Sequence, residues 1–352
     1  MAAIKDVAAC AGLSISAVSK YLKNPDSVRE DTRIRVEKAI DSLNYIPSLA
    51  ARALRTGRTN MILLMIPDVR DLKTNFLIDA IQSIMRSRGM TVVLLSESTL
   101  EHLYSDSGAL SAYPVDGMFI YHPLNIDLIR RYVQEFPNTP KVVVGHPIWK
   151  DTSTFLWDIG EPAYLVTRHL LELGHLRIGY IGTPPKSPFF SNRFNQELNF
   201  RRALMEVDAP LYESLIYRGS QDSPRNDDFT YRLGLKGAQF LLERDNPPTA
   251  VVASNTETAI GCINWARLHG FSVPEDLAVA SCDENIISRQ MFPPVTSVQV
   301  PVLETAQLAM EKLLAMINGT DNGEVSMVLP VDAPTVLHVR RSTDPNAPML
   351  IE

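Results

Sequence analysis

The sequence is poor in cysteine and has no long apolar stretch. Among its 352 residues there are three cysteines, Cys10, Cys262 and Cys282, and none belongs to a Cys-x-x-Cys or Cys/His grouping. This scarcity argues against a disulfide framework and against a structural zinc site. No run of about 18 apolar residues occurs, and the N-terminus lacks the apolar core of a secretory signal. We therefore expect a cytoplasmic protein without a membrane partner.

The chain also lacks the motifs of common nucleotide-dependent and hydrolytic enzymes. It contains no GxGxxG, no GxxxxGK[ST] and no GxSxG. Residues 179–182, with the sequence GYIG, end an apolar run, but no glycine-rich loop follows them. The histidines His146, His169 and His175 do not pair with a nucleophile. The sequence thus predicts no enzyme, no cofactor and no metal ion.

The net charge of −6 conceals two regions of opposite sign. Residues 1–60 carry ten Lys or Arg against six Asp or Glu, an excess of four positive charges. The remaining residues carry 24 basic and 34 acidic side chains, an excess of ten negative charges. A basic head on an acidic body is suited to a polyanionic partner that contacts the head alone.

The pattern of residues 1–46 predicts a helix-turn-helix head. Apolar positions recur at helical spacing over residues 4–11, and Gly12 follows as a left-handed turn residue. Ser14 can cap a second helix over residues 15–22. Opposite its apolar face, that helix has a short, mostly polar face that carries one base and suits a DNA major groove: Ile15, Ser16, Ser19 and Lys20. A solvated face of a small helical hairpin is the alternative.

A third helix and a short hinge helix are predicted next. Residues 27–30, Ser-Val-Arg-Glu, fit a capping box at the start of the third helix. Within residues 47–59, Pro47 cannot extend it, and a new helix of about eight residues follows, too short to be stable alone in water. Its small Ala51, its Arg55 and its protruding Leu54 fit a minor groove, where alanine allows close approach, arginine meets phosphate and leucine wedges a base step. A linker helix packed on the protein is the alternative.

Two segments of this head resemble a known family. IKDVAACAGLSISAVSKYL and VREDTRIRVEKAIDSLNYIPSLAARALRTGRTN are similar to the head and hinge of the lactose-repressor (LacI/GalR) family of bacterial regulators. The resemblance implies that Ile15, Ser16 and Lys20 read bases and that Leu54 inserts at the operator centre. It also implies contacts to phosphates, or support of the groove helix, by a second set: Ser14, Ser19, Asn24 and Tyr45.

Beyond the head, the pattern changes to alternating strands and helices. Apolar runs predict strands at 61–68, 91–96, 115–121, 141–145, 177–182, 214–219, 249–255 and 277–283, with helices at 76–88 and 161–173 among them. Such alternation predicts an α/β fold, and the number of strands favours two doubly wound parallel-sheet subdomains. We expect residues 60–343 to bind an effector and to dimerise, with the chain crossing between subdomains near 159–162, 287–293 and 323–330. Residues 344–352 would form a tail.

Ligands of doubly wound sheets bind beyond the carboxyl ends of the strands. Candidate effector-binding residues follow the predicted strands or lie near their ends: Asp68, Lys73, Glu161, Arg193, Gln196, Asn255 and Asp283. Polar groups from both subdomains would converge on one cleft, which suits a sugar or another small polar metabolite.

The family resemblance continues through the body in HLLELGHLRIGYIG, VPEDLAVASCDE, FPPVTSVQVP and LHVRRST. It implies the fold of periplasmic sugar-binding proteins, and Asp283 matches a ligand-binding position of the family. Three positions depart from the family pattern: Lys73-Thr74 replaces an aromatic pair, Gln196 replaces an arginine, and Thr256 replaces an aspartate after Asn255. The effector could therefore be a carbohydrate, an atypical metabolite or a partner protein.

Together these features predict a sequence-specific DNA-binding transcriptional regulator. A homodimer would bind a pseudo-palindromic double-stranded DNA operator, with a small molecule in the cleft as effector, and repression is the sign that the resemblance implies. Control by a partner protein is one alternative. A cytoplasmic solute-binding receptor is another, although a receptor serving a transporter would need an export signal or a lipid anchor.

Overall fold

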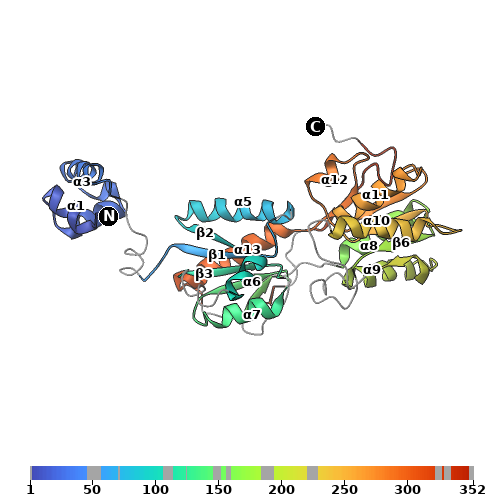
Figure 1. Cartoon of the computed structure of the whole chain (residues 1–352), viewed down its shortest axis with the longest axis horizontal. Helices are drawn as coiled ribbons and strands as arrows, with labels where there is room; N and C mark the ends of the chain where they lie inside the picture. Colours follow the sequence, from blue (N-terminus) through green and yellow to red (C-terminus); the bar gives the residue numbers. More distant parts are fainter. Residues whose placement is uncertain are drawn as a thin grey trace. The chain divides into compact units, whose positions relative to one another are not determined.

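A computed structural model describes most of the chain: residues 2–45, 57–69, 72–105, 114–123, 125–145, 152–155, 160–183, 194–219, 229–321, 327–328 and 334–348. The chain divides into two compact units, residues 1–60 and residues 61–352 (Figure 1). We call the first unit the head and the second the body.

The described residues of the head form three helices and one 3-10 turn: α1 (Ile4–Ala11), α2 (Ile15–Lys23), η1 (Pro25–Ser27) and α3 (Glu30–Leu43). Val7 of α1, Val18 of α2 and Val36 of α3 are fully buried together in its core. Gly12 ends α1 with φ +63°, the left-handed conformation expected from the sequence. The three helices thus enclose one small core.

The predicted capping box at residues 27–30 is wrong. Arg29 is the N-cap of α3 and makes no side-chain capping bond. The Ser27 hydroxyl instead donates to the Asn24 carbonyl oxygen at 2.6 Å, within the turn before α3. A serine hydroxyl can donate to a carbonyl of its own turn as readily as it caps the next helix, so the Ser-Val-Arg-Glu pattern did not determine which of the two would form. Residues 46–56, with the predicted hinge helix, lie outside the described residues.

The body contains two six-stranded sheets, each the centre of one lobe. The first-lobe sheet has the order β11-β5-β4-β3-β1-β2, and every pairing in it is parallel. Its strands are β1 (Met61–Ile66), β2 (Thr91–Ser96), β3 (Gly117–Tyr121), β4 (Lys141–Val144), β5 (Ser153–Phe155) and β11 (Met327–Val328). Its helices are α5 (Leu72–Ser87), α6 (Glu97–Ser105), α7 (Ile126–Gln134) and α13 (Val302–Asn318).

Alternate residues of β1 pack on opposite faces of this sheet. Ile62, Leu64 and Ile66 belong to the core shared with α5 and α13. Leu63 and Met65 belong to the core shared with α6 and α7. Because both faces are covered, β1 is apolar throughout rather than alternating, as in other buried parallel strands.

The second-lobe sheet has the order β12-β10-β9-β8-β6-β7. Its strands are β6 (Ile178–Ile181), β7 (Ile216–Tyr217), β8 (Ala250–Ala253), β9 (Ala278–Ser281), β10 (Thr296–Gln299) and β12 (Val336–His338), and only β12 is antiparallel to its neighbour. Its helical segments are α8 (Glu161–Glu172), α9 (Phe194–Met205), η4 (Glu213–Leu215), α10 (Phe229–Leu242), α11 (Thr256–Leu268) and α12 (Ile286–Gln290). The cores on its two faces are formed mainly with α10 and α11, and with α8 and α9.

The predicted α/β class with two doubly wound lobes is confirmed. Each predicted strand is present, in most cases one to four residues shorter than its apolar run. The short strands β5, β10, β11 and β12 were not predicted, because two to four residues carry too little periodicity. No helix among the described segments has the length and apolar character needed to cross a membrane.

The order of the described strands and helices places three passages of the chain between the two lobes. The first passage lies between Phe155 and Glu161, and the third between Val328 and Val336. The second lies at residues 300–301, between β10 and α13, since α13 packs into the first-lobe core. The predicted passage at 287–293 is therefore wrong: that segment includes most of α12 and remains in the second lobe.

Candidate DNA-binding head and effector edge

The outer face of α2 carries the residues predicted to read bases. Ile15 is 52% exposed, while Val18 of the same helix is fully buried. Ser16 and Lys20 are also exposed, so the three predicted readers lie on the surface of the head. A large aliphatic side chain left in water at this position is available for an apolar contact such as a thymine methyl group.

Two of the predicted phosphate-contacting residues also cap local structure. The Ser14 hydroxyl oxygen accepts a hydrogen bond from the Ala17 amide at 3.2 Å. The Asn24 side-chain oxygen accepts one from the Asp26 amide at 3.1 Å. Capping uses only the side-chain oxygens of these two residues. The Ser14 hydroxyl hydrogen and the Asn24 Nδ2 group would therefore be the donors to a phosphate. Ser19 and Tyr45 are half-buried, and Tyr45 packs against the head core.

Sequence reasoning missed the residue that holds the turn of the motif. Arg35 of α3 donates from Nε and Nη2 to the Ala11 carbonyl oxygen, at 3.0 and 2.6 Å, and from Nη2 to the Gly12 carbonyl oxygen at 2.8 Å. These carbonyls at the C-terminus of α1 have no intrahelical donor. Arg35 thereby fixes α3 to the turn that precedes α2.

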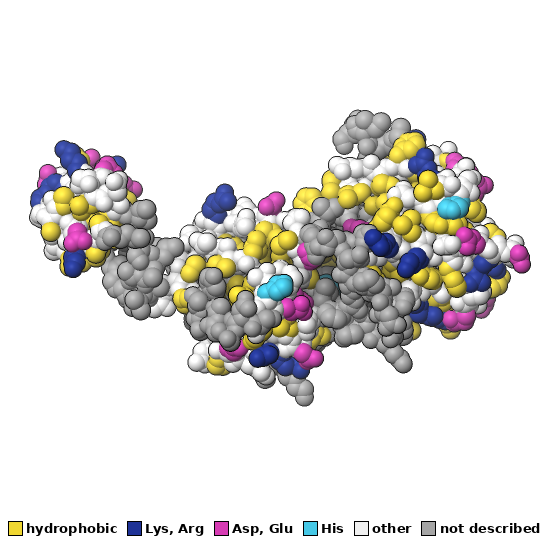
Figure 2. All heavy atoms as spheres, viewed as in Figure 1, with side chains coloured by type: hydrophobic (Ala, Val, Ile, Leu, Met, Phe, Trp, Pro, Cys, Tyr) yellow, Lys and Arg dark blue, Asp and Glu magenta, His cyan; other side chains and the backbone are white. Residues whose placement is uncertain are grey.

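On the face of the head that Figure 2 shows, the charged side chains do not form one patch of a single sign. Figure 2 shows basic and acidic side chains interspersed on its visible face. Part of this mixing is intrahelical, since Arg33 and Glu37 of α3 pair at 3.1 Å.

The second-lobe residues predicted to bind an effector lie at one edge of its sheet. Asn255 follows β8 and caps α11, its side-chain oxygen accepting from the Thr258 amide at 2.8 Å. Asp283 follows β9, and its Oδ1 accepts from the Thr256 amide at 2.7 Å and the Thr256 hydroxyl at 2.9 Å. We call this carboxyl-terminal side of the second-lobe sheet the effector edge.

Three buried polar atoms at the effector edge have no hydrogen-bond partner within the described part of the chain. They are Thr183 Oγ1, Gln196 Oε1 and Ser254 Oγ, and each residue is at most 7% exposed. Gln196 reaches the edge from α9, because its Nε2 donates to the Ser254 carbonyl oxygen at 3.3 Å. Ser254 was not predicted, although its position directly after a buried strand could have indicated it.

The other predicted effector residues are less well defined. Asp68 follows β1 in the first lobe, and Glu161 begins α8; both are half-buried. Lys73 lies in α5, but only its backbone is described, and Arg193 lies outside the described residues. The structure thus brings together Gln196, Asn255 and Asp283 from the predicted set.

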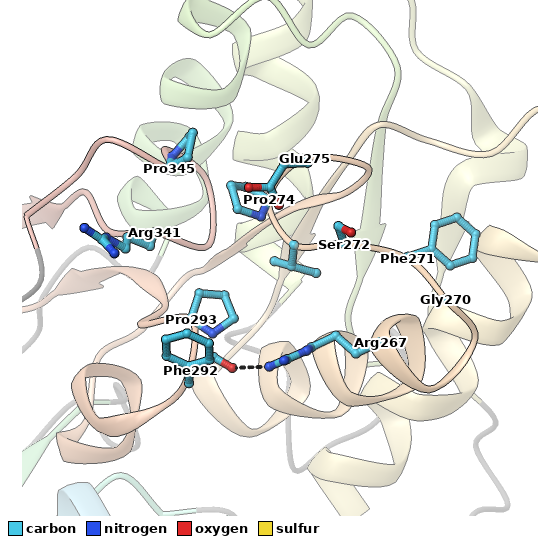
Figure 3. A pocket seen from close by; sticks show the side chains of 11 residues that line it. Arg267, Gly270, Phe271, Ser272, Pro274, Glu275, Phe292, Pro293, Arg341 and Pro345 are labelled. Carbon is cyan, nitrogen blue, oxygen red and sulfur yellow. Dashed lines mark hydrogen bonds between the residues drawn. The ribbon is translucent and has the colours of Figure 1, made fainter.

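A hollow of about 490 Å³ lies at the opposite edge of the second-lobe sheet (Figure 3). It is lined by segments that precede β9 and β10, including Phe271, Pro274 and Phe292. None of the predicted effector residues lines it. Among the described residues, no group of His, Cys, Asp and Glu side chains could hold a metal ion.

Comparison with known proteins gives two family matches. Residues 3–48 match the model of bacterial regulatory proteins of the lacI family. Residues 167–343 match the model of periplasmic binding protein-like domains. The first match covers the helix-turn-helix head, and the second covers most of the second lobe and the last passages of the chain.

Individual relatives match over nearly the whole chain. The HTH-type transcriptional repressor CytR of Escherichia coli (strain K12) is 30% identical over 97% of this chain and 96% of its own. A complex of the transcriptional regulator CelR with cellobiose is 25% identical, with a TM-score of 0.67 over 97% of this chain and 100% of that chain. A lac repressor dimer bound to operator and the anti-inducer ONPF is 22% identical, with a TM-score of 0.76 over 97% and 99%.

Proposed function

Because this chain belongs to the lacI family of bacterial regulatory proteins, we propose that it represses transcription as a homodimer on a pseudo-palindromic operator, under control of a small molecule bound at the effector edge. Its full-length relative CytR is a transcriptional repressor, not an enzyme. The lac repressor that it resembles in fold is described as a dimer bound to operator. A two-fold dimer presents two heads to two half-sites of one operator.

The exposed face of α2 supports the DNA-binding part of this proposal. Ile15, Ser16 and Lys20 lie together on the surface, opposite the buried Val18. In the proposed complex, α2 lies in the major groove, and the segment with Leu54 lies in the minor groove at the operator centre. The extent of the functional regions is proposed as head 1–46, hinge 47–59, body 60–343 and tail 344–352.

The observation that carries the small-molecule part is the set of unpaired buried atoms. Buried polar atoms in native proteins are almost always hydrogen-bonded, so three at one edge that have no partner among the described residues favour a partner of another kind. Hydroxyl groups of a carbohydrate or related metabolite could supply both donors and acceptors to Thr183, Gln196 and Ser254. CelR, which shares this fold, is described in complex with cellobiose. These inward, buried atoms favour a small molecule over a partner protein.

The DNA-binding proposal is tested by selecting duplexes from a random pool with the full-length chain. We expect a pseudo-palindromic consensus bound with a stoichiometry of two chains per duplex. A chain lacking residues 1–58 should remain folded and dimeric but shift none of the selected duplexes. Specific binding by the shortened chain would refute the assignment of the head.

The effector proposal is tested by thermal shift of the shortened chain with sugars, sugar phosphates and nucleosides. A true effector binds the native state and raises the unfolding temperature with increasing concentration. Gln196→Leu should abolish the shift by removing an edge polar group, while Gln239→Leu, which alters an exposed glutamine of α10, should leave it intact. An equal shift in both variants would place the ligand elsewhere.

A further inference from the structure

Glu284 is an ionised side chain in the interior of the second lobe. Its side chain is 4% exposed. In the sequence, Glu284 directly follows Asp283 of the effector edge. Burial by itself would raise the pKa of Glu284, but hydrogen bonds and charge from Arg289 and Arg340 outweigh it and hold the pKa below its usual value. Glu284 is therefore negatively charged at neutral pH.

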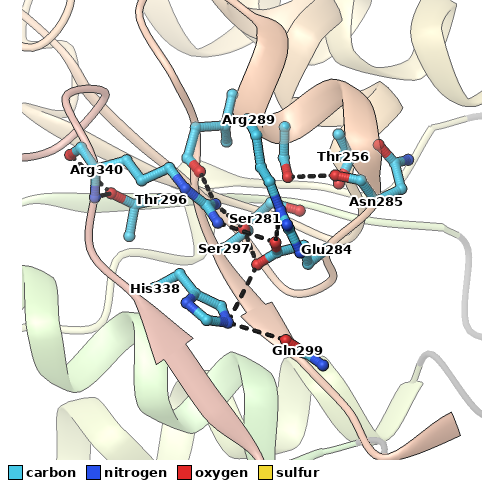
Figure 4. Close-up of polar contacts among 12 residues, drawn as sticks. Thr256, Ser281, Glu284, Asn285, Arg289, Thr296, Ser297, Gln299, His338 and Arg340 are labelled. Carbon is cyan, nitrogen blue, oxygen red and sulfur yellow. Dashed lines mark hydrogen bonds and ion pairs between the residues drawn. The ribbon is translucent and has the colours of Figure 1, made fainter. Parts of the chain in front are cut away.

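The partners of Glu284 come from three different elements (Figure 4). Arg289 of α12 donates from Nε to Oε1 at 2.7 Å, and Arg340, just after β12, donates from Nη2 to the same oxygen at 2.9 Å. The Ser297 hydroxyl of β10 donates to Oε2 at 3.1 Å, and His338 Nε2 of β12 lies 3.5 Å from Oε2. One carboxylate thus joins α12, β10 and β12.

β10 and β12 are the strands by which the second lobe continues into the first. β10 ends at Gln299, three residues before α13 enters the first-lobe core. β12 begins at Val336, after the passage from β11 of the first-lobe sheet. Ser297 and His338, which both contact Glu284, are direct partners in the β10–β12 ladder. Glu284 therefore contacts both β10 and β12, at a pair of residues that face each other in the ladder.

The residues on either side of Glu284 bind the start of α11. Asp283 accepts from the amide and hydroxyl of Thr256, the first residue of α11. Asn285 donates from Nδ2 to Glu257 Oε1 at 2.8 Å, also in the first turn of α11. Three consecutive side chains thus join the effector edge on one side to the connecting strands on the other.

We propose that Glu284 is a positioning residue that couples the effector edge to β10 and β12, the strands that lead into the first lobe, and that operator binding depends on the arrangement of the two lobes that these strands maintain. This inference rests on the proposed function. Coupling between sites requires an element whose equilibrium both sites bias, and the segment 283–285 contacts both. Loss of the Glu284 charge should free the connecting strands and let arrangements with weaker operator affinity become populated.

The chain offers a matched control in Glu197. Its side chain is 6% exposed and pairs with two arginines of the same lobe, Arg201 at 2.8 Å and Arg218 at 2.7 Å. It resembles Glu284 in burial and charge pairing, but these two arginines come from α9 and the segment after β7, at the other end of the sheet from β10 and β12. A stability effect common to buried ion pairs would appear in both variants.

The test compares full-length wild type, Glu284→Gln and Glu197→Gln on the highest-affinity duplex from the random-pool selection. We expect Glu284→Gln to weaken operator affinity five- to tenfold and to accelerate amide exchange at residues 297–299 and 336–338. Glu197→Gln should stay within twofold of wild type. Equal affinities in all three proteins, or equal losses in both variants, would overturn the proposal.

Two further arms keep the result decisive. If Glu284→Gln does not fold, Ser297→Ala serves in its place. It removes the hydroxyl that joins Glu284 to β10 and that also accepts from Arg340 Nη1, and it should weaken operator affinity in the same direction. Wild-type affinity in that variant would overturn the proposal. If wild type binds no selected duplex, the proposed function itself fails. If wild type binds and the variants bind equally well, only the role of Glu284 fails.

Discussion

Thr256 donates two hydrogen bonds to one oxygen of Asp283, from its backbone amide at 2.7 Å and from its hydroxyl at 2.9 Å. Both residues are buried, so the Asp283 carboxylate relies on these donors in place of water. The family resemblance places an aspartate where this chain has Thr256, and an ionised carboxylate there could not donate the bond that the Thr256 hydroxyl donates.

Thr256→Val should destabilise the body. It keeps the branched shape but removes the hydroxyl donor, and a lost hydrogen bond to a buried charged group costs about 1–3 kcal/mol. Urea unfolding of the full-length chain measures the loss. Thr305→Val is the control, because the equally buried Thr305 hydroxyl donates to a neutral carbonyl, that of Pro301. A larger loss in the Thr305 variant would contradict this account.

Arg35→Met should loosen the turn of the helix-turn-helix. The methionine keeps an apolar stem but leaves the Ala11 and Gly12 carbonyl oxygens without their donors, a loss of about 1–3 kcal/mol. Amide hydrogen exchange of α1 in the full-length chain should accelerate, and operator affinity should fall. Arg33→Met, on the same helix, removes only solvent-exposed ion pairs and should change little. Equal effects of the two variants would argue against a special role for Arg35.

Leu54→Ala should weaken operator binding and reduce the bending of the bound duplex. A leucine wedge holds a base step open, and alanine is too short to do so. Gel mobility of circularly permuted duplexes measures the bend. Leu176→Ala alters a leucine that is 60% exposed in the body and should leave the bend unchanged. An unaltered bend in the Leu54 variant would rule out the wedge.

The stability of the body should decline as the pH falls below 6.5, the ordinary pKa of histidine. Burial lowers the pKa of His169, and burial followed by the charge of His169 lowers that of His175. Between the lowered pKa of the folded protein and the ordinary one, the unfolded chain binds more protons, so unfolding becomes easier at lower pH. His169→Gln should flatten the decline measured by urea unfolding at pH 7.5 and 5.5. Glu197 and Glu284, whose pKa values are lowered, affect the pH dependence of stability only below the ordinary glutamate value of 4.5, outside the range from pH 7.5 to 5.5.

The sequence predicted features that depend on near neighbours. The predictions of a left-handed turn at Gly12 and of a helix cap at Ser14 are confirmed, because both features are decided within three or four residues. The bond from Arg35 to Ala11 spans 24 residues, and a guanidinium on a helix is equally compatible with solvent. The approach of Gln196 to Ser254 spans 58 residues and depends on how α9 packs on the sheet.

The passages between lobes show the same limit. Val300-Pro301 has one proline but no glycine or run of polar residues to mark a crossing, whereas the predicted passage at 287–293 ends at the first of two consecutive prolines, Pro293 and Pro294, which are typical of loops. The membership of α13 in the first lobe follows from its contacts with β3 and β4, not from its own pattern. Amphipathic helices specify that they are buried but not which sheet buries them.

The placement of α13 has a consequence for synthesis on the ribosome. The strands β1 to β5 emerge early, yet Ala306, Met310 and Leu313 complete their core from more than 140 residues further along the chain. The nascent first lobe must therefore wait, with one apolar face of its sheet covered by α5 alone, until almost the entire second lobe has been translated. The second lobe in turn lacks its last strand until β12 emerges. Neither lobe can finish folding before the other is nearly made, so the body matures as one piece.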